Sequence, residues 1–335
     1  MTSRATPTLQ GDAALDRLRR WITGAGIAGA RVATAERLFG GAIQENWRLH
    51  MEDGQSLVLR TDSDARIPTS CTRAQEYARY CLAHRHGVRV PRPFGLCEDV
   101  GVIGKPFFLL EFVRGVTAGH LLVKPQAVPD RDALAFELGT LLGDLHRVPH
   151  EPVRAVFGAA PASTPASAVA KLRRLLDQLH DAHAPLELCL RELELRLGDS
   201  SEAVFSHGDY RTGNYMVDQG RVTAILDWEF CGWSHPAEDL GWFTAPCWRF
   251  ARMDMGAGGI GPLERFLDGY ASRTGRRLDA SELHAWQALA QVKWALIALH
   301  QEQRHASGAQ RALELALSGR LVAGLTLEAM SLLEL

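Results

Sequence analysis

Three polar side chains between residues 204 and 241 have the types and spacing that hold a divalent cation beside a base. Asn214 and Asp227 offer one amide oxygen and one carboxylate, and Asp209 lies five residues before Asn214. A few hard oxygen ligands, with room left for water and phosphate, are what Mg²⁺ bound to a nucleotide requires. Asp209 can face the same spot without binding the metal, which suits a base that accepts a proton from a hydroxyl.

A short hairpin is expected to bring Asn214 and Asp227 close together. The segment 218–221, DQGR, is a turn signal between two apolar runs. If its two central residues form the turn, residue 218 faces 221 and Asn214 faces residue 225. Asp227 then lies two residues beyond that partner, which is roughly 7 Å along the strand.

The chain up to about residue 113 is predicted to be rich in strands after one initial helix. Glu52-Asp53-Gly54-Gln55 is a tight-turn signal and predicts a hairpin. Gly87 is expected to end the second helix. The expected elements are helices over 13–22 and from Pro68 to about His86, and strands over 44–51, 56–60, 94–97 and 107–112.

The rest of the chain has mainly helical periodicity. Pro129-Asp130 is expected to cap a helix whose leucines recur on one face. Residues 149–168, rich in Ala, Pro and Ser, are interpreted as a surface loop. Further helices are expected near 172–179, over 186–197 and from Leu263 onward. The prediction is a small sheet-rich lobe, 1–113, and a larger helical lobe, 114–335.

The motif H-G-D-x-x-x-x-N, here His207 to Asn214, is followed thirteen residues later by Asp227-Trp228-Glu229. This combination resembles the aminoglycoside phosphotransferase and choline kinase family, whose members share the protein-kinase fold. The sequence looks most like the phosphotransferase-like domains that accompany some acyl-CoA dehydrogenases. The resemblance extends from Gly40 to about Arg304. It implies a two-lobed α+β fold with a small antiparallel-sheet N-lobe and a larger, mainly helical C-lobe.

For the second lobe, the resemblance implies that Asp209 is the catalytic base or hydroxyl-orienting carboxylate. It implies that Asn214 and Asp227 are the Mg²⁺ ligands. Asp239 matches an aspartate that we interpret as structural support. Glu229 either binds Mg²⁺ indirectly or only orients the loop.

For the first lobe, the resemblance implies the residues that bind ATP. Gly40 and Gly41 match the glycine-rich turn over the phosphates, and Arg60 matches the basic residue that contacts them. The remaining matches are Glu76, as the helix glutamate that pairs with Arg60, and Glu111-Phe112-Val113, as the hinge whose backbone holds adenine.

Two features depart from the family pattern. Many members have Lys where Arg60 stands, and Arg keeps the charge but differs in reach. Ala42 to Asn46 follows the glycines, where small polar residues are usual. Its carboxylate, Glu45, must face away from a triphosphate.

The implied activity is ATP-dependent transfer of a phosphoryl group to the hydroxyl of a small molecule. The first alternative is a catalytically weak nucleotide-binding protein with a regulatory role. The second is a metal hydrolase that uses His207, Asp209 and Asp227, although the segment 204–241 that contains them has no two histidines at H-x-x-x-H spacing. We expect His207 to be a scaffold histidine and His146 to be packed or capping.

Tryptophan is concentrated after Asp227, where six of the eight lie. A hydrophobic core of the helical lobe is the favoured interpretation. The other is an aromatic acceptor pocket, for which Trp233, Trp242 and Arg249 are the candidate wall residues.

Composition limits the class of partner. The formal net charge of −2 argues against a general nucleic-acid binder. The sequence contains no run of about 18 apolar residues and begins without an apolar signal core, so we expect no membrane span and a cytoplasmic protein. Six scattered cysteines indicate a reduced chain without a thiolate zinc site. A monomer or homodimer is expected.

Overall fold

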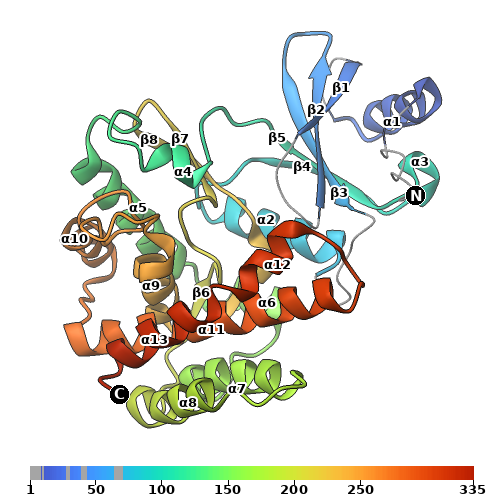
Figure 1. Ribbon diagram of the computed structural model, residues 1–335. Helices are drawn as coiled ribbons and strands as arrows, with labels where there is room; N and C mark the ends of the chain where they lie inside the picture. The colour runs from blue at the N-terminus through green and yellow to red at the C-terminus, as the bar shows by residue number, and fades with distance from the viewer. Residues whose placement is uncertain (1–8, 10, 28–30, 39–43, 64–70) are drawn as a thin grey trace. The chain divides into compact units, whose positions relative to one another are not determined.

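The computed structural model describes residues 9, 11–27, 31–38, 44–63 and 71–335. The chain divides into two compact units, Met1–Arg114 and Gly115–Leu335 (Figure 1). The first contains a small antiparallel sheet and the second is mainly helical. The α+β, two-lobed fold class expected from the sequence is therefore confirmed.

The first unit is built on a five-stranded antiparallel sheet in the order β1-β2-β3-β5-β4. The expected hairpin connects β2 to β3. The elements are α1 (Asp12–Gly24), β1 (Val32–Leu38), β2 (Gln44–Met51), β3 (Ser56–Asp62), α2 (Arg73–Arg85), β4 (Pro93–Cys97), α3 (Val100–Ile103) and β5 (Phe107–Glu111).

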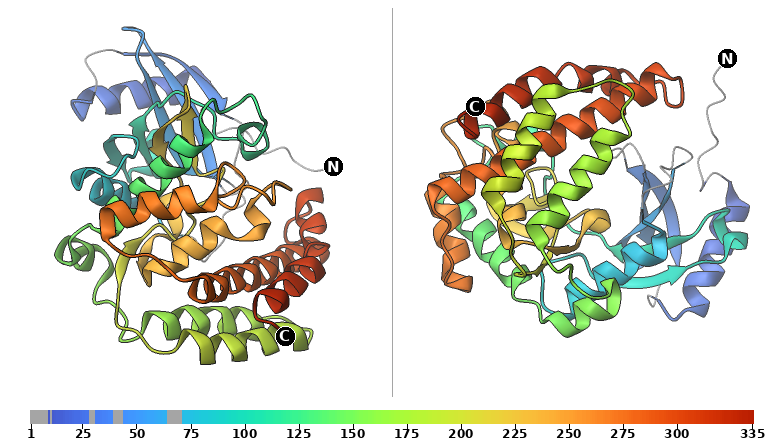
Figure 2. Two further views of the ribbon diagram at one scale, coloured as in Figure 1. Left: turned by 90° about the vertical axis from the view of Figure 1, so that its left-hand side faces the viewer. Right: turned by 90° about the horizontal axis from the view of Figure 1, so that it is seen from below.

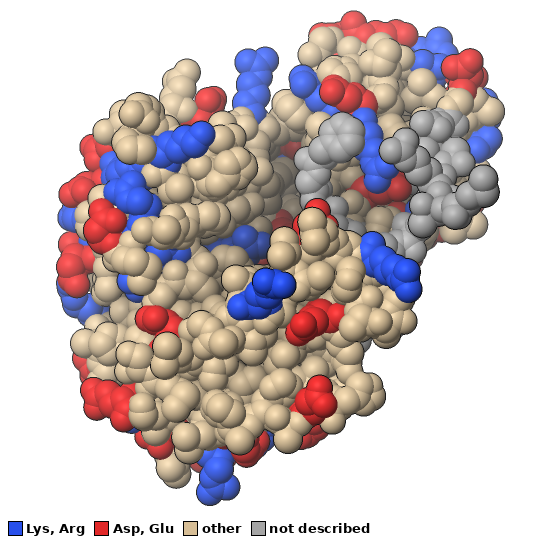
Figure 3. Space-filling model, in the orientation of Figure 1, with Lys and Arg blue, Asp and Glu red and all other residues tan. Residues whose placement is uncertain are grey.

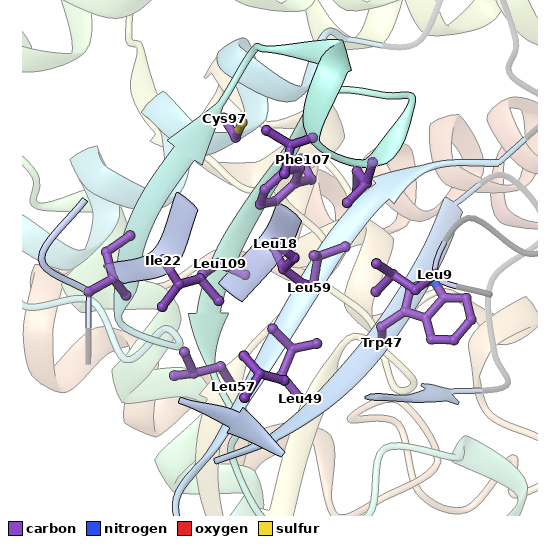
Figure 4. Packing of buried hydrophobic residues seen from close by; sticks show 14 of the residues in the cluster. Leu9, Leu18, Ile22, Trp47, Leu49, Leu57, Leu59, Cys97, Phe107 and Leu109 are labelled. Carbon is purple, nitrogen blue, oxygen red and sulfur yellow. The ribbon is translucent and has the colours of Figure 1, made fainter. Parts of the chain in front are cut away.

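Alternation of side chains gives β2 and β3 one buried face and one half-buried face. Leu57, Leu59 and Leu109 point to one face, where α1 packs its Leu18 and Ile22 against them (Figure 4). Burial of each such side chain contributes about 1.5–3 kcal/mol. The residues between them point to the opposite face, which is therefore the face that carries Arg60.

Helix α2 begins later than expected. The sequence suggested Pro68 as the start, and residues 64–70 lie outside the described part. Arg73 is the first helical residue because Thr72 forms a capping box with Gln75. Gly87, with φ of +75°, follows the helix as predicted.

The second unit is a helical assembly with two small two-stranded sheets, β6-β9 and β7-β8. Figure 2 shows α7 and α8 side by side, with the long helix α11 packed on them. The elements are α4 (Gly119–Leu122), α5 (Arg131–His146), α6 (His150–Phe157), α7 (Thr164–Asp177), α8 (Ala184–Leu197), β6 (Val204–Ser206), β7 (Tyr215–Asp218), β8 (Arg221–Ile225), η1 (Trp228–Phe230), β9 (Gly232–Ser234), α9 (Pro236–Thr244), η2 (Pro246–Trp248), α10 (Leu263–Thr274), α11 (Ala280–Ala306), α12 (Leu313–Gly319) and α13 (Val322–Leu332).

The surface loop expected over 149–168 is wrong in part. Helix α6 occupies its first half, and α7 begins at Thr164 with Ser163 as its N-cap. Pro149 precedes the first turn of α6, and Val153 is the one fully buried side chain within it. A helix this short leaves too few apolar positions for its period to be recognised in the sequence.

The C-terminal helices α12 and α13 include a long apolar stretch. Within the described residues, Leu313–Leu332 is long and apolar enough to cross a membrane by length and composition alone, and 22% of it is buried. This candidate is not an unbroken apolar run, because it includes Glu314, Arg320 and Glu328, and the expectation that the chain has no membrane span stays a prediction. One such helix is weak evidence for a membrane span. In this structure α12 and α13 pack against α11 (Figure 1).

Candidate active site

The loop that carries Asp209 is tied to α9 by one buried carboxylate. Asp239 accepts the backbone N–H of His207 at 2.8 Å and that of Gly208 at 2.9 Å. Nε2 of His146 lies 3.1 Å from the same carboxylate. Burial raises the pKa of Asp239, but the hydrogen bonds and charge of His146 and the His207 backbone outweigh it and lower the pKa to about 2. Asp239 thus fixes the backbone immediately before Asp209.

Gly208 is required by close packing and by its backbone conformation. Its φ is +75°, and a Cβ there would lie 2.4 Å from the carbonyl oxygen of Phe230. The carbonyl of Gly208 accepts a hydrogen bond of 2.8 Å from Nζ of Lys293 on α11. The peptide units on either side of Gly208 are therefore held by both α9 and α11.

Asp209 is buried, with 8% of the residue exposed. Its carboxylate accepts hydrogen bonds from three side chains. Nε1 of Trp242 donates to Oδ1 at 2.7 Å, and Nε of Arg211 donates to the same oxygen at 3.1 Å. Nδ2 of Asn214 donates to Oδ2 at 2.5 Å. The structure thus joins two of the predicted site residues, Asp209 and Asn214, directly.

The β7–β8 hairpin has the predicted turn but a different register. Asp218 pairs with Arg221, and Gln219 and Gly220 both have positive φ. A bulge in β8 then moves the register by one residue, so that residue 225 faces Tyr215 and not Asn214. The N–H of Leu226 donates to the carbonyl of Asn214 at 2.7 Å. Asp227 therefore follows the partner of Asn214 directly, one residue nearer than expected.

Asn214 and Asp227 fit a hard cation by their chemistry. Nδ2 of Asn214 donates to the backbone oxygen and to Oδ2 of Asp209. Its Oδ1 has no hydrogen-bond partner in the part of the chain that the structure describes. Asp227 adopts the left-handed conformation, with φ of 66°, at the start of η1. An amide oxygen and a carboxylate leave most coordination positions for water and phosphate, as Mg²⁺ prefers.

His207 is a scaffold residue, as expected. Its Nε2 donates to the carbonyl of Leu226 at 2.9 Å, and its Nδ1 accepts the N–H of Asp209 at 3.2 Å. Both ring nitrogens are therefore used by the backbone and cannot bind a metal. Among the described residues no group of three His, Cys, Asp or Glu could hold a metal ion. The bonds of its two ring nitrogens count against His207 as the metal ligand that the metal-hydrolase alternative requires.

His146 is also packed, as expected, since its Nδ1 lies 3.0 Å from the hydroxyl of Tyr270 and its Nε2 contacts Asp239.

In the first unit, Arg60 and Glu76 form the ion pair that the resemblance implied. Nε of Arg60 lies 2.8 Å from Oε1 of Glu76, which is fully buried. A second arginine, Arg73, pairs with Oε2 of Glu76 and lies 3.0 Å from Oδ1 of Asp62. The sequence analysis missed Arg73, although its position three residues before Glu76 on the same helix was a usable signal.

Gly40 and Gly41 lie outside the described residues. Glu45, the carboxylate that departs from the family pattern, is 5% exposed and faces the α1 side of the sheet. It lies 3.6 Å from Nη2 of Arg37, and Nε1 of Trp47 donates to it at 3.4 Å. Asn46, its neighbour, pairs with Arg60 and shares the face of that arginine. Glu45 therefore points away from the face that carries Arg60.

The segment expected to be the hinge follows β5. The backbone N–H of Glu111 donates to the carbonyl of Arg92 at 2.9 Å, and the carboxylate of Glu111 accepts the N–H of Arg92. Phe112 is covered by the guanidinium of Arg48 at 4.0 Å, and Val113 is half-buried. A cavity of about 340 Å³ adjoins this segment within the first unit. It is lined by Arg48, Gly54, Gln55, Ser56, Leu57, Arg92, Phe94, Glu111, Phe112 and Arg114.

The three residues suggested for an acceptor wall lie in different surroundings. Trp233 is half-buried on β9 and donates to the carbonyl of Gly158 at 2.9 Å. Arg249 donates twice to the carbonyl of Thr244. Only Trp242 contacts Asp209.

The sequence analysis did not assign a role to Lys293 or Arg211. Lys293 interrupts an otherwise apolar part of α11, and that interruption was the available signal.

The sequence matches a phosphotransferase family profile and parts of two acyl-CoA dehydrogenase family members. Residues 34–280, more than half of the chain, match the profile described as the phosphotransferase enzyme family. Acyl-CoA dehydrogenase family member 11 of Gallus gallus is 28% identical over 200 residues, covering 57% of this chain and 25% of that protein. Member 10 of Mus musculus is 23% identical over 208 residues, covering 60% of this chain and 19% of that protein. The chain thus spans a quarter or less of these relatives.

Solved structures show the same fold. A Ralstonia eutropha protein assigned to the aminoglycoside phosphotransferases has a TM-score of 0.76 and 21% identity, covering 95% of this chain and 98% of that one. A spectinomycin phosphotransferase solved with ADP and spectinomycin has a TM-score of 0.62 and 14% identity, covering 96% and 98%. Together with the profile match, these findings show that the chain belongs to the phosphotransferase enzyme family.

Proposed function

We propose that the protein transfers the γ-phosphoryl group of Mg-ATP to a hydroxyl of a small molecule, with Asp209 as the base. The observation that carries the proposal is the carboxylate of Asp209, held by Trp242, Arg211 and Asn214 on a loop that α9 and α11 fix. A base fixed in this way can align an acceptor hydroxyl for in-line attack, and alignment supplies much of the rate in phosphoryl transfer.

Within the second unit the proposed roles fall on Asn214, Asp227 and Asp209, and within the first unit on Arg60. Asn214 Oδ1 and the carboxylate of Asp227 would hold Mg²⁺, which when bound neutralises charge on the phosphates. Arg60, oriented by Glu76, would contact the phosphates. Asp209 would accept the proton of the acceptor hydroxyl. The spectinomycin phosphotransferase that shares this fold was solved with ADP, which supports nucleotide use.

The proposal is tested by comparing the wild-type protein with Asp209→Asn. We expect transfer from Mg-ATP, or its slow hydrolysis, to fall by about 100-fold or more, because a general base typically contributes that much. ATP affinity, measured by calorimetry, should change less than twofold. Asp218→Asn, at the exposed end of the same hairpin, is the control and should retain full activity.

The acceptor panel should contain sugars, amino alcohols, hydroxy acids and acyl-CoA-linked hydroxyls. Wild-type protein that binds Mg-ATP but shows neither transfer nor hydrolysis across this panel would contradict the proposal. That result would favour a regulatory nucleotide-binding protein.

A further inference from the structure

Trp242 is more than a core residue of α9, because its indole contacts the proposed base. It is 3% exposed, and its N–H donates to Oδ1 of Asp209, 33 residues away in sequence, at 2.7 Å. We propose that Trp242 is a positioning residue that occupies Oδ1 together with Arg211, so that Oδ2 is the oxygen that receives the acceptor proton. This inference rests on the proposed function.

The assignment of Oδ2 follows from the number of donors at each oxygen. A carboxylate oxygen accepts about two hydrogen bonds. Oδ1 of Asp209 already accepts two, from Trp242 and Arg211. Oδ2 accepts one side-chain hydrogen bond, from Asn214, in the described part of the chain. One acceptor position is therefore left at Oδ2, and an incoming hydroxyl can use it.

The proposed step is balanced as follows. The acceptor oxygen forms a bond to the γ-phosphorus, and the bond from that phosphorus to the β,γ-bridging oxygen breaks. ADP leaves with the electron pair of the broken bond. The hydroxyl proton moves to Oδ2, and the carboxyl group later releases it to solvent. Trp242 does not touch the reacting atoms and acts only through Asp209.

The indole itself is held in place from two sides. The ammonium of Lys293 lies 4.3 Å from the centre of its ring, and the ring of Trp248 lies 5.1 Å away. The neighbouring Gly241 packs so closely on α11 that a Cβ there would lie 2.5 Å from Cβ of Trp286. Lys293 also donates to the carbonyl of Gly208, so one side chain orients both the indole and the loop. Rotation of the indole away from Asp209 is therefore opposed by its packing.

The test compares Trp242→Phe with the wild type in Mg-ATP turnover. Phenylalanine keeps an aromatic six-membered ring and lacks the five-membered ring that carries the N–H. A hydrogen bond to a charged group is stronger than one between neutral groups. Its loss from Asp209 should therefore lower kcat about 10- to 100-fold and leave both KM values within twofold. In an Asp209→Asn background the same substitution should have no further effect. The control is Trp47→Phe, a buried tryptophan of the first unit whose N–H also donates to a carboxylate, that of Glu45, and this variant should keep kcat while losing stability.

A spectroscopic measurement tests the contact without turnover. In ¹⁵N-labelled full-length protein, the indole N–H signal lost in Trp242→Phe identifies Trp242. That signal should move upfield in Asp209→Ala and stay in place in Asp218→Asn. The positioning role is overturned if Trp242→Phe has the kcat of the wild type. It is also overturned if the chemical shift of the indole N–H is unchanged in Asp209→Ala. The proposed function stands in both cases. A wild-type protein without any turnover overturns both.

Discussion

At the scale of residues, the one carboxylate of Glu76 pairs with two arginines, the buried Arg73 and the half-buried Arg60. It lies 2.8 Å from Nε of Arg60 and also pairs with Arg73, and Glu76 is fully buried. Breaking a buried ion pair by removing one partner typically costs about 3–5 kcal/mol, and Glu76→Gln removes the fully buried partner of both arginines while Arg73 keeps Asp62. Glu76→Gln should therefore lower the free energy of unfolding by about that amount, measured by urea denaturation.

The control for this prediction is Glu36→Gln in the same unit. Glu36 is 65% exposed in its pair with His50, and exposed pairs contribute about 0–1 kcal/mol. A loss below about 1 kcal/mol in Glu76→Gln would show that the arginines are solvated or paired elsewhere.

The lowered pKa of Asp239 predicts that the stability of the folded protein depends on pH. Burial raises its pKa, but His146 and the His207 backbone lower it to about 2 in the folded protein, below the value of about 3.9 in an unfolded chain. A depressed folded-state pKa gives stability that is present above pH 4 and is lost as the pH falls toward 2. The shift corresponds to about 2–3 kcal/mol.

Asp239→Asn should remove this contribution. The variant should be less stable than the wild type at pH 7, and the difference should shrink when unfolding free energies are measured from pH 5 down to pH 2.5. Asp181→Asn, at an exposed site, should follow the wild-type curve. An Asp239→Asn deficit that is constant with pH would mean that the loss is steric rather than electrostatic.

Site residues close in sequence could be predicted, and those joined only by folding could not. The spacing from Asp209 to Asn214 was visible because one loop contains both, and the structure joins them by a hydrogen bond. Trp242 was noticed for its aromatic character, but its contact with Asp209 spans 33 residues and depends on how α9 packs. The contact of Arg73 with Asp62 likewise depends on tertiary structure.

At the scale of elements, helices α5 and α10 pack closely through glycines. A Cβ at Gly139 would lie 2.0 Å from the carbonyl oxygen of Phe266, and a Cβ at Gly269 would lie 2.1 Å from that of Phe136. Gly139→Ala must therefore push the helices apart and should cost about 2 kcal/mol or more.

Gly324→Ala is the matched control for this prediction. Gly324 is also helical, on α13, and a Cβ there meets nothing within 4 Å. Alanine has the higher helix propensity, so this variant should gain about 0.5–1 kcal/mol. Thermal denaturation should show a lower midpoint for Gly139→Ala and a higher midpoint for Gly324→Ala than for the wild type. Equal midpoints for the two variants would contradict the close packing of α5 and α10.

Elements with a strong period were predictable, whereas irregular ones were not. The β2–β3 hairpin and helix α5 follow from a turn signal and a leucine face, and both lie where expected. Helix α6 is too short and too exposed to show a period. The bulge in β8 changes the register by one residue without any change in composition, so the strand pattern could not reveal it.

At the scale of the whole molecule, membership of the family does not identify the acceptor molecule. The charge of this chain indicates which class of acceptor it can bind. From residue 246 to the end, the chain has ten Arg plus Lys and nine Asp plus Glu. On the face shown in Figure 3, basic and acidic side chains are interspersed and do not form one acidic patch. Arg211 lies 3.1 Å from the carboxylate of Asp209, and Lys293, which contacts the same loop, lies 3.9 Å from Glu238. A polycationic acceptor would require distinctly acidic surroundings.

Hygromycin B and spectinomycin, bound by other phosphotransferases of this fold, are suitable probes of that argument. We expect neither to raise the thermal midpoint of this protein beyond the effect of Mg²⁺ and a non-hydrolysable ATP analogue alone, because a ligand stabilises only the state that binds it. Neutral and anionic hydroxyl compounds in the same screen should include at least one that does. A saturable shift with hygromycin B, abolished at high salt, would instead show that the local field around Asp209 accepts cations and that overall charge balance does not select the acceptor.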